Sequence, residues 1–144
     1  MKLDFYIKNK FVKVGYLTAI KPDGIREKKH GIYFIGDAPK SKGVYIIAKD
    51  LEVLKFGVTN ASNGMESRIE MYLSNPESTN VWVRENLKKE IQYEIYFYEI
   101  IPEFENIMGV KVEKSILPKS LEEALIKDYT QKYGMRPRLN NSAN

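Results

Sequence analysis

Hydrophobic and aromatic residues in the first part of the chain gather in short runs typical of β-strands. Residues 11–19 and 31–35 show this pattern, and the turn residues Lys-Pro-Asp-Gly at 21–24 lie between them. Two more β-rich segments, 44–48 and 53–58, flank a short polar stretch, Lys-Asp-Leu-Glu. The sequence therefore predicts two strands followed by a β-hairpin.

The segment 92–101 is the strongest predicted strand, because β-branched and aromatic residues fill most of it. Alternation places Tyr93, Ile95 and Phe97 on one face, with two further tyrosines on the other. Aromatic residues on a strand can stack on nucleic-acid bases. Apolar residues on both faces are more typical of a buried central strand, so we predict that these aromatics belong to the core.

Two helices are predicted from the 3.6-residue period. The first covers residues 65–73 and carries Arg68 beside its apolar side. The second covers residues 121–133, with Ser120 as its N-cap and Glu123 at the third helical position, the spacing of a capping box. The predicted order is a β-rich arm, a β-hairpin, a helix, a strand and a helix, which makes the fold class α+β.

The amino-acid composition excludes several classes of protein and several kinds of metal site. The chain has 144 residues, of which 43% are hydrophobic, so we expect one compact folded unit with its own core. It has no cysteine and one histidine, His30, which excludes disulfides, cysteine-based zinc sites and multi-histidine metal clusters. The sequence shows neither a membrane span nor the apolar core of a signal peptide. We therefore expect a soluble, cytoplasmic protein without a membrane partner.

Positive charge is concentrated at the beginning of the chain, although the net charge is only +4. Residues 1–40 contain nine Lys and Arg against four Asp and Glu, a balance of 9 − 4 = +5. The remaining residues contain 14 against 15, a balance of −1. Such a distribution indicates either a contact with a polyanion or a solvated basic surface, and charge alone leaves both open.

A Gly-aliphatic-Tyr triplet occurs twice, at 31–33 and at 43–45, and Lys-Phe-Gly follows at 55–57. Nine residues separate each triplet from the next, so spacing does not decide which two belong together. The second and third are favoured, because Gly57 then stands at a strand end and permits a tight turn. This pair also leads directly into the turn and helix that carry Arg68.

The favoured pair, followed by an arginine, resembles the core of the GIY-YIG nuclease superfamily. The later helix with Glu122 and the Pro-Arg-Leu-Asn stretch at 137–140 are similar to that family's glutamate helix and terminal asparagine. Together these features span residues 42–141. The chain departs from the pattern at Lys55, which replaces the second tyrosine as in some restriction-enzyme and phage-type members. Its arginine and its asparagine also follow at wider spacings.

The resemblance implies a small three-stranded antiparallel sheet flanked by helices in residues 42–144, preceded by an extra N-terminal β-rich arm in residues 1–41. It further implies a metal-dependent endonuclease, with DNA as its partner and Mg²⁺, or another divalent cation such as Mn²⁺, as its cofactor. The basic arm would then contact the DNA duplex through its phosphates.

The resemblance also implies a role for each site residue. Tyr45 would be a general base, and the ammonium group of Lys55 would favour its phenolate form. Arg68 would stabilise the charge of the transition state through its fork of donors. Tyr72, one helical turn further on, would orient the phosphate or the attacking water. Asn140 would brace the site, with Asn141 left open as the alternative.

Glu122 has the strongest local argument of the candidate residues. It falls in the middle of a helix side formed by Leu125, Ile126, Tyr129 and Tyr133. A carboxylate on an apolar side is costly unless it is paired or bound to a metal. One carboxylate with waters and a phosphate suits Mg²⁺, so we predict a metal ligand. A buried salt bridge, for example with an arginine, is the structural alternative.

Two other functions stay open on the sequence alone. One is a non-catalytic nucleic-acid-binding module on the same fold, and the other is an α+β protein-interaction domain. The charged groups Arg68 and Glu122 favour the nuclease, because a site that has lost its activity tends to lose charges that are costly to bury. One active site cuts one strand, so a double-strand break needs a homodimer or two successive nicks. The sequence leaves open this choice, the recognition sequence, and DNA against RNA.

Overall fold

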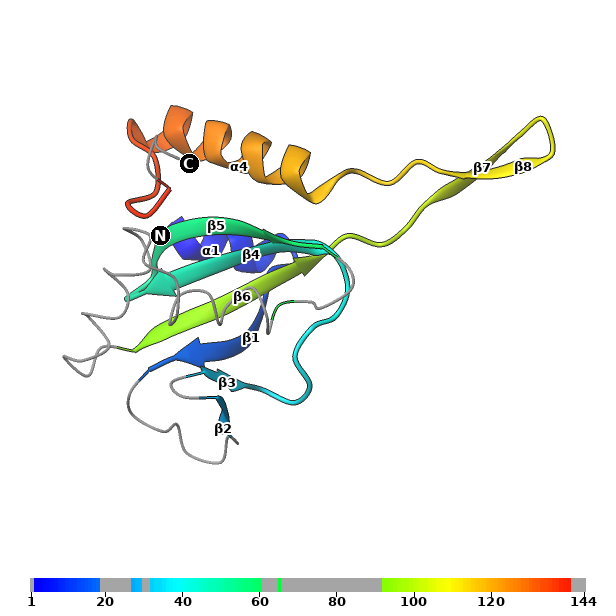
Figure 1. Cartoon of the computed structure of the whole chain (residues 1–144). Coiled ribbons are helices and arrows are strands. Elements are labelled where there is room, and N and C mark those ends of the chain that lie inside the picture. Colours follow the sequence, from blue (N-terminus) through cyan, green and yellow to red (C-terminus); the bar gives the residue numbers. More distant parts are fainter. Residues whose placement is uncertain (1, 19–26, 30–31, 61–64, 66–91, 141–144) are drawn as a thin grey trace.

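The computed structural model describes residues 2–18, 27–29, 32–60, 65 and 92–140, and the structural statements below concern this part of the chain. It contains a six-stranded sheet, a two-stranded hairpin and two helices (Figure 1). The strands of the sheet are β1 (Val12–Leu17), β2 (Glu27–Lys29), β3 (Ile32–Phe34), β4 (Gly43–Lys49), β5 (Glu52–Thr59) and β6 (Tyr93–Glu99). The hairpin consists of β7 (Phe104–Ile107) and β8 (Val110–Glu113), and the helices are α1 (Lys2–Lys8) and α4 (Pro118–Tyr133).

All neighbouring strands of the large sheet run antiparallel, in the order β2-β3-β1-β6-β4-β5. The predicted α+β class is confirmed, with the three expected strands β4, β5 and β6 side by side at one end of the sheet. The strands of the predicted N-terminal arm continue this same sheet, because β1 pairs directly with β6. The sheet is therefore six strands wide where the resemblance implied three.

The hairpin predicted around residues 49–52 is confirmed as β4 and β5. Asp50 and Leu51 at its tip both have positive φ, 51° and 67°. Two central residues with positive φ are the mark of a type I′ turn, whose twist matches that of the flanking strands. Both strands are almost completely buried along their length. The side chains of these two strands therefore project from a well-packed, buried backbone.

The core lies on both faces of the sheet, as the pattern of residues 92–101 predicted. Tyr93, Ile95 and Phe97 belong to one apolar cluster, together with Tyr45 and Ile47 of β4. The other face forms a second cluster, to which β4, β5, β6 and both helices contribute, with these buried members: Leu3, Tyr6, Phe11, Val44, Ile46, Ala48, Val53, Phe56, Tyr96 and Tyr129. We name these the first and the second cluster. Helices α1 and α4 therefore cover the same face of the sheet (Figure 1).

Helix α4 begins three residues earlier than predicted, and the predicted capping box is wrong. Leu117 is the N-cap residue and makes no side-chain capping bond, and Pro118 opens the helix. Proline suits the first helical position because its fixed φ is already helical and its missing N–H has no partner to lose there. Ser120 therefore lies inside the first turn. The helix ends at Gly134, which has a φ of 78° and whose N–H bonds the carbonyl of Thr130 at 2.9 Å.

The hairpin of β7 and β8 stands apart from the rest of the structure (Figure 1). Every residue of its two strands is exposed, so it contributes nothing to either core cluster. Met108 and Gly109 form its tip with positive φ. The sequence predicted neither this hairpin nor α1.

Two sequence predictions lie largely outside the described residues. They are the turn at 21–24 and the helix at 65–73, of which Met65 alone is described, as a buried member of the first cluster. Within the described part of the chain, neither helix is long and apolar enough to cross a membrane.

Candidate active site

The pairing of β4 with β5 settles which triplets form a structural unit. Tyr45 lies directly opposite Gly57 in the register, whereas β3, with the earlier triplet, is separated from β4 by β1 and β6. A methyl group added to Gly57 would collide with the ring and the hydroxyl of Tyr45. The glycine is therefore required because the phenol of Tyr45 lies across it, a closer approach than any side chain would allow.

Lys55 lies on the same face of the sheet as Tyr45. It pairs with Ile47, which is two residues after Tyr45 and so shares its face. The side chain of Lys55 is buried, at 8% exposure, and its Nζ lies 3.4 Å from the carbonyl oxygen of Leu139. The two residues therefore share one face of the β4–β5 pair, and the effect of the ammonium group on the phenol stays a prediction.

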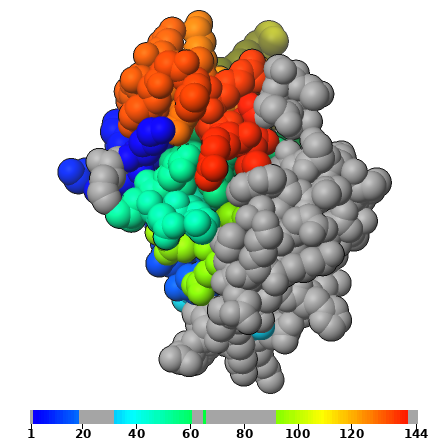
Figure 2. Space-filling view, turned by 90° about the vertical axis from the view of Figure 1, so that its left-hand side faces the viewer, coloured from blue at the N-terminus to red at the C-terminus, as the bar shows by residue number. Residues whose placement is uncertain are grey.

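The C-terminal segment of the described chain runs along β5 and fixes it. The N–H of Leu139 donates to the carbonyl of Leu54 at 2.8 Å. The side-chain amide of Asn140 uses both of its groups on the backbone of Phe56. Its Oδ1 accepts from the Phe56 N–H at 2.6 Å, and its Nδ2 donates to the Phe56 carbonyl at 2.9 Å. Figure 2 shows this segment, in red, packed against the green strands. Asn140 thus braces β5 between Lys55 and Gly57.

Glu122 is buried on α4, at 7% exposure, as its position on the helix predicted. The apolar residues around it pack against the second cluster: Leu121, Leu125, Ile126 and Tyr133. Its Oε1 accepts a hydrogen bond from the Nζ of Lys119, one turn earlier, at 2.9 Å. The sequence analysis missed Lys119, because it placed the start of the helix beyond that residue.

Glu122 and Tyr45 approach the site from different layers. Tyr45 belongs to the first cluster, whereas α4 packs on the opposite face of the sheet. Both lie toward the end of the sheet where β4 begins and β6 ends. Gly43, at the start of β4, pairs with Glu99, at the end of β6. Glu99 lines the same cavity as Leu121, the chain neighbour of Glu122. The structure therefore places Tyr45 and Lys55 on β4 and β5, with Asn140 beside them in the C-terminal segment. Glu122 lies on α4, on the other face of the sheet. Arg68, Tyr72, His30 and Asn141 lie outside the described residues.

The residues around Glu122 fit a cation site with a single protein carboxylate. The described part of the chain contains no group of three or more His, Cys, Asp or Glu that could enclose a metal ion. Mg²⁺ commonly binds through one or two carboxylates and completes its shell with water and phosphate. The hydrogen-bond partner of Glu122, Lys119, has a side chain that is 66% exposed, so a cation can displace it into solvent without burying a charge.

Comparison with known sequences assigns the chain to no family. No family model matches it, and no curated protein matches it. Solved structures give a different result, because their backbones can be compared directly.

The structure resembles that of a mutant of bacteriophage T4 EndoII, with a TM-score of 0.63 and 17% sequence identity; the match covers 98% of this chain and 100% of that one. It also resembles the restriction endonuclease HPY188I in complex with product DNA, with a TM-score of 0.52 and 16% identity, over 93% of this chain and 82% of that one. The chain shares its backbone fold with these two proteins. At these identities the likeness concerns the path of the backbone and leaves the roles of individual side chains to be tested.

Proposed function

We propose that the protein is a metal-dependent endonuclease of the GIY-YIG type that hydrolyses phosphodiester bonds of DNA. One observation carries the proposal above all. The phenol of Tyr45 lies across Gly57 with the buried Lys55 on the same face, in a chain whose fold is shared with a restriction endonuclease. An aromatic ring across from an edge-strand glycine also occurs in ordinary sheets. A core tyrosine does not need a buried lysine on its face, however, so a purely structural role leaves Lys55 unexplained.

The chemistry follows from the residues in place. The phenolate of Tyr45, favoured by the ammonium group of Lys55, takes a proton from a water molecule. The water oxygen forms a bond to phosphorus, the bond from phosphorus to the 3′ oxygen breaks, and this leaving oxygen takes a proton from solvent. Arg68 would neutralise charge on the phosphoryl oxygens. A divalent cation bound to Glu122 would add positive charge beside the phosphate.

The proposal requires a change at Tyr45 when DNA binds, because its side chain is fully buried in the free chain. A general base must come within hydrogen-bond distance of the proton that it abstracts. We therefore expect the Tyr45 hydroxyl to become accessible in the complex. Nitration of tyrosines followed by mass spectrometry checks this, and Tyr45 should be modified with a non-cleavable DNA bound and protected without it.

A binding module without catalysis is the second candidate, and the ion pair between Lys119 and Glu122 favours it. If that pair is purely structural, the role of Glu122 is to hold Lys119 and not a cation, and the chain would only hold nucleic acid. Cleavage of supercoiled plasmid in Mg²⁺ or in EDTA separates the two functions. The key variant is Glu122→Gln, and Glu123→Gln is its matched control, because Glu123 is exposed on the same helix.

The nuclease proposal predicts nicked or linear plasmid in Mg²⁺ and none in EDTA. Glu122→Gln should lower the rate by about 10- to 100-fold or more, as expected for lost metal affinity, and Glu123→Gln should leave it unchanged. Tyr45→Phe should lower the rate by about 100- to 10,000-fold, the usual contribution of a general base. Salt-sensitive gel shifts without cleavage, even on a genome-sized substrate, would instead establish the binding module.

A further inference from the structure

We propose that the β7–β8 hairpin is a self-association arm. Two copies of the chain lay their hairpins side by side in opposite directions, so that the tip of each enters the cavity at the base of the other. The interface then obeys a twofold axis and uses the same surface on both chains. This inference does not depend on the proposed nuclease function.

The hairpin has one apolar face that nothing in the described chain covers. Ile107 pairs with Val110, and Glu105 pairs with Val112, so three of these four neighbours on one face are aliphatic. The other face is polar apart from Phe104, over which the Nζ of Lys111 lies at 4.4 Å from the ring centroid. Val110 is 60% exposed and Met108 at the tip is 94% exposed. Isolated two-stranded hairpins are marginally stable in water, so a partner on this face would stabilise the arm.

The base of the hairpin holds the arm in an extended position. The backbone N–H of Glu103 donates to the Ser115 hydroxyl at 2.7 Å, and the N–H of Lys114 donates to the Glu103 carbonyl at 2.8 Å. Lys42, just before β4, bonds the carboxylate of Glu113 at 2.8 Å and ties the arm to the sheet. Because these contacts fix both strands at their base, the apolar tip is held away from the chain's own core (Figure 1).

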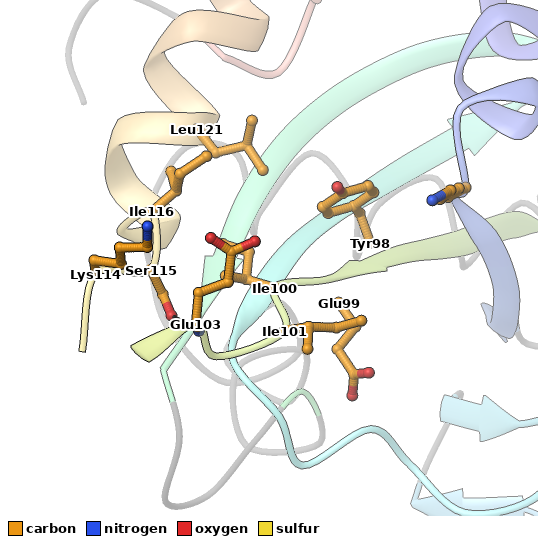
Figure 3. A pocket seen from close by; sticks show the side chains of 10 residues that line it. Tyr98, Glu99, Ile100, Ile101, Glu103, Lys114, Ser115, Ile116 and Leu121 are labelled. Atoms are coloured by element: carbon orange, nitrogen blue, oxygen red, sulfur yellow. Dashed lines mark hydrogen bonds between the residues drawn. The ribbon is translucent and has the colours of Figure 1, made fainter. Parts of the chain in front are cut away.

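A cavity of 420 Å³ lies at this base, between the hairpin, the end of β6 and the first turn of α4. Figure 3 shows aliphatic side chains around it, among them Ile100, Ile116 and Leu121, with the charged groups of Glu103 and Lys114 beside them. A volume of this size accepts side chains such as those of Ile107 and Met108. In the proposed dimer the two hairpins lie antiparallel about a twofold axis, so that each tip enters the cavity at the partner's base.

The charges of the arm favour a second copy over nucleic acid. Between residues 101 and 117 the chain has two lysines and three glutamates, a balance of 2 − 3 = −1. DNA binding draws its affinity from neutralised phosphates, and an arm without positive excess cannot supply that. An arm that carries both lysines and glutamates can instead pair with the opposite charges of an antiparallel copy.

The oligomeric state of the full chain tests the proposal. Sedimentation velocity should give a dimer of twice the 16.7 kDa chain mass, that is 2 × 16.7 = 33.4 kDa. The double substitution Ile107→Glu and Met108→Glu should convert it to the monomer. Met135→Glu is the matched control, because Met135 is apolar, 59% exposed and outside the hairpin, and it should leave the dimer intact. A wild-type chain that is still monomeric at about 100 µM overturns the proposal.

Cysteine cross-linking tests the antiparallel arrangement itself, and the chain suits it because it contains no cysteine of its own. The substitutions Met108→Cys and Ile116→Cys put one thiol at the tip and one at the base. The double variant should form a covalent dimer on mild oxidation, and each single variant should not. A covalent dimer from Met108→Cys alone would show that tips meet tips and overturn the arrangement. Loss of DNA binding in a hairpin variant that was monomeric from the start would assign the arm to nucleic acid.

Discussion

At the scale of single residues, the contact between Tyr45 and Gly57 is the feature that most constrains the candidate site. The ring occupies the space that a Cβ at position 57 would need. We expect Gly57→Ala to lower the free energy of unfolding by about 1–3 kcal/mol, as other overpacked cores do. It should also reduce cleavage, because the phenol is displaced. Urea unfolding and plasmid cleavage measure the two effects.

A double-mutant cycle attributes that loss to the ring. In a Tyr45→Val background the space above position 57 is empty, so Gly57→Ala should cost much less than it does in the wild-type chain. A coupling energy near zero would mean that the alanine acts on the strand backbone and that the Tyr45 contact is incidental.

Tyr93, a member of the same cluster, gives stability a pH dependence. Burial raises its pKa to about 12, against a weaker opposing effect of Arg138. The folded chain thus holds the phenol proton more tightly than the unfolded chain does. Its contribution to stability is complete below the ordinary tyrosine pKa of 10.0 and is lost as the pH rises toward about 12.

Urea midpoints measured between pH 9 and pH 12 (a window spanning roughly the unfolded and folded pKa values) check this. The wild-type midpoint should fall across the window, and Tyr93→Phe should flatten part of the decline. The remaining decline of the midpoint should come from Tyr6, because burial raises its pKa as well. An unchanged profile in Tyr93→Phe would show that this phenol titrates normally.

At the scale of elements, the periodic spacing of hydrophobic residues predicted those helices and strands that bury a regular stripe of side chains in the core. The β4–β5 hairpin, both faces of β6 and the buried side of α4 with Glu122 follow from alternation or helical spacing, because each buries a regular stripe. Helix α1 is short and buries two residues of its own, Leu3 and Tyr6, too few for a period. The β7–β8 hairpin buries none, so no core selected its pattern.

The candidate site likewise has a part that local sequence patterns predict and a part that they do not. Tyr45, Lys55, Glu122 and Asn140 could be named from local motifs. The contacts that hold them could not, because these contacts join distant residues or depend on an element boundary. Asn140 meets Phe56 across 84 positions of sequence, and no local pattern encodes that. Lys119 was missed because Pro118 starts α4 one turn before the capping pattern suggested.

The first turn of α4 offers a direct test of the metal hypothesis. Lys119 and a cation would compete for the negative charge of the Glu122 carboxylate. We expect Lys119→Met to lower the Mg²⁺ concentration needed for half-maximal cleavage and to enlarge the rise in Tm caused by Mg²⁺, since binding to the folded state stabilises it. Lys127→Met on the same helix is the control. A variant that is destabilised and insensitive to Mg²⁺ would assign the pair a structural role.

At the scale of the whole molecule, the N-terminal strands form one sheet with strands β4, β5 and β6. Strand β1 pairs with β6 from Val12↔Phe97 to Leu17↔Tyr93, and α1 fills part of the second cluster. Removing residues 1–41 would expose the edge of β6 and uncover that cluster. An uncovered edge with apolar side chains favours aggregation. The basic segment is therefore built into the core, and any contact that it makes with DNA is made by a surface that the fold holds in place.

Truncation makes this last point measurable. We expect a fragment of residues 42–144 to be insoluble or to lack a cooperative unfolding transition, whereas the full chain with the exposed Lys8 and Lys10 changed to glutamine stays folded. The substituted chain tests the effect of the two lysine charges on DNA binding while the fold stays intact. If these lysines contact phosphates, its DNA affinity should fall and the dependence of log K on log salt should flatten by about one per lost contact. A fragment that folds alone would instead make residues 1–41 a separable DNA-binding arm, as the division at residue 41 predicts.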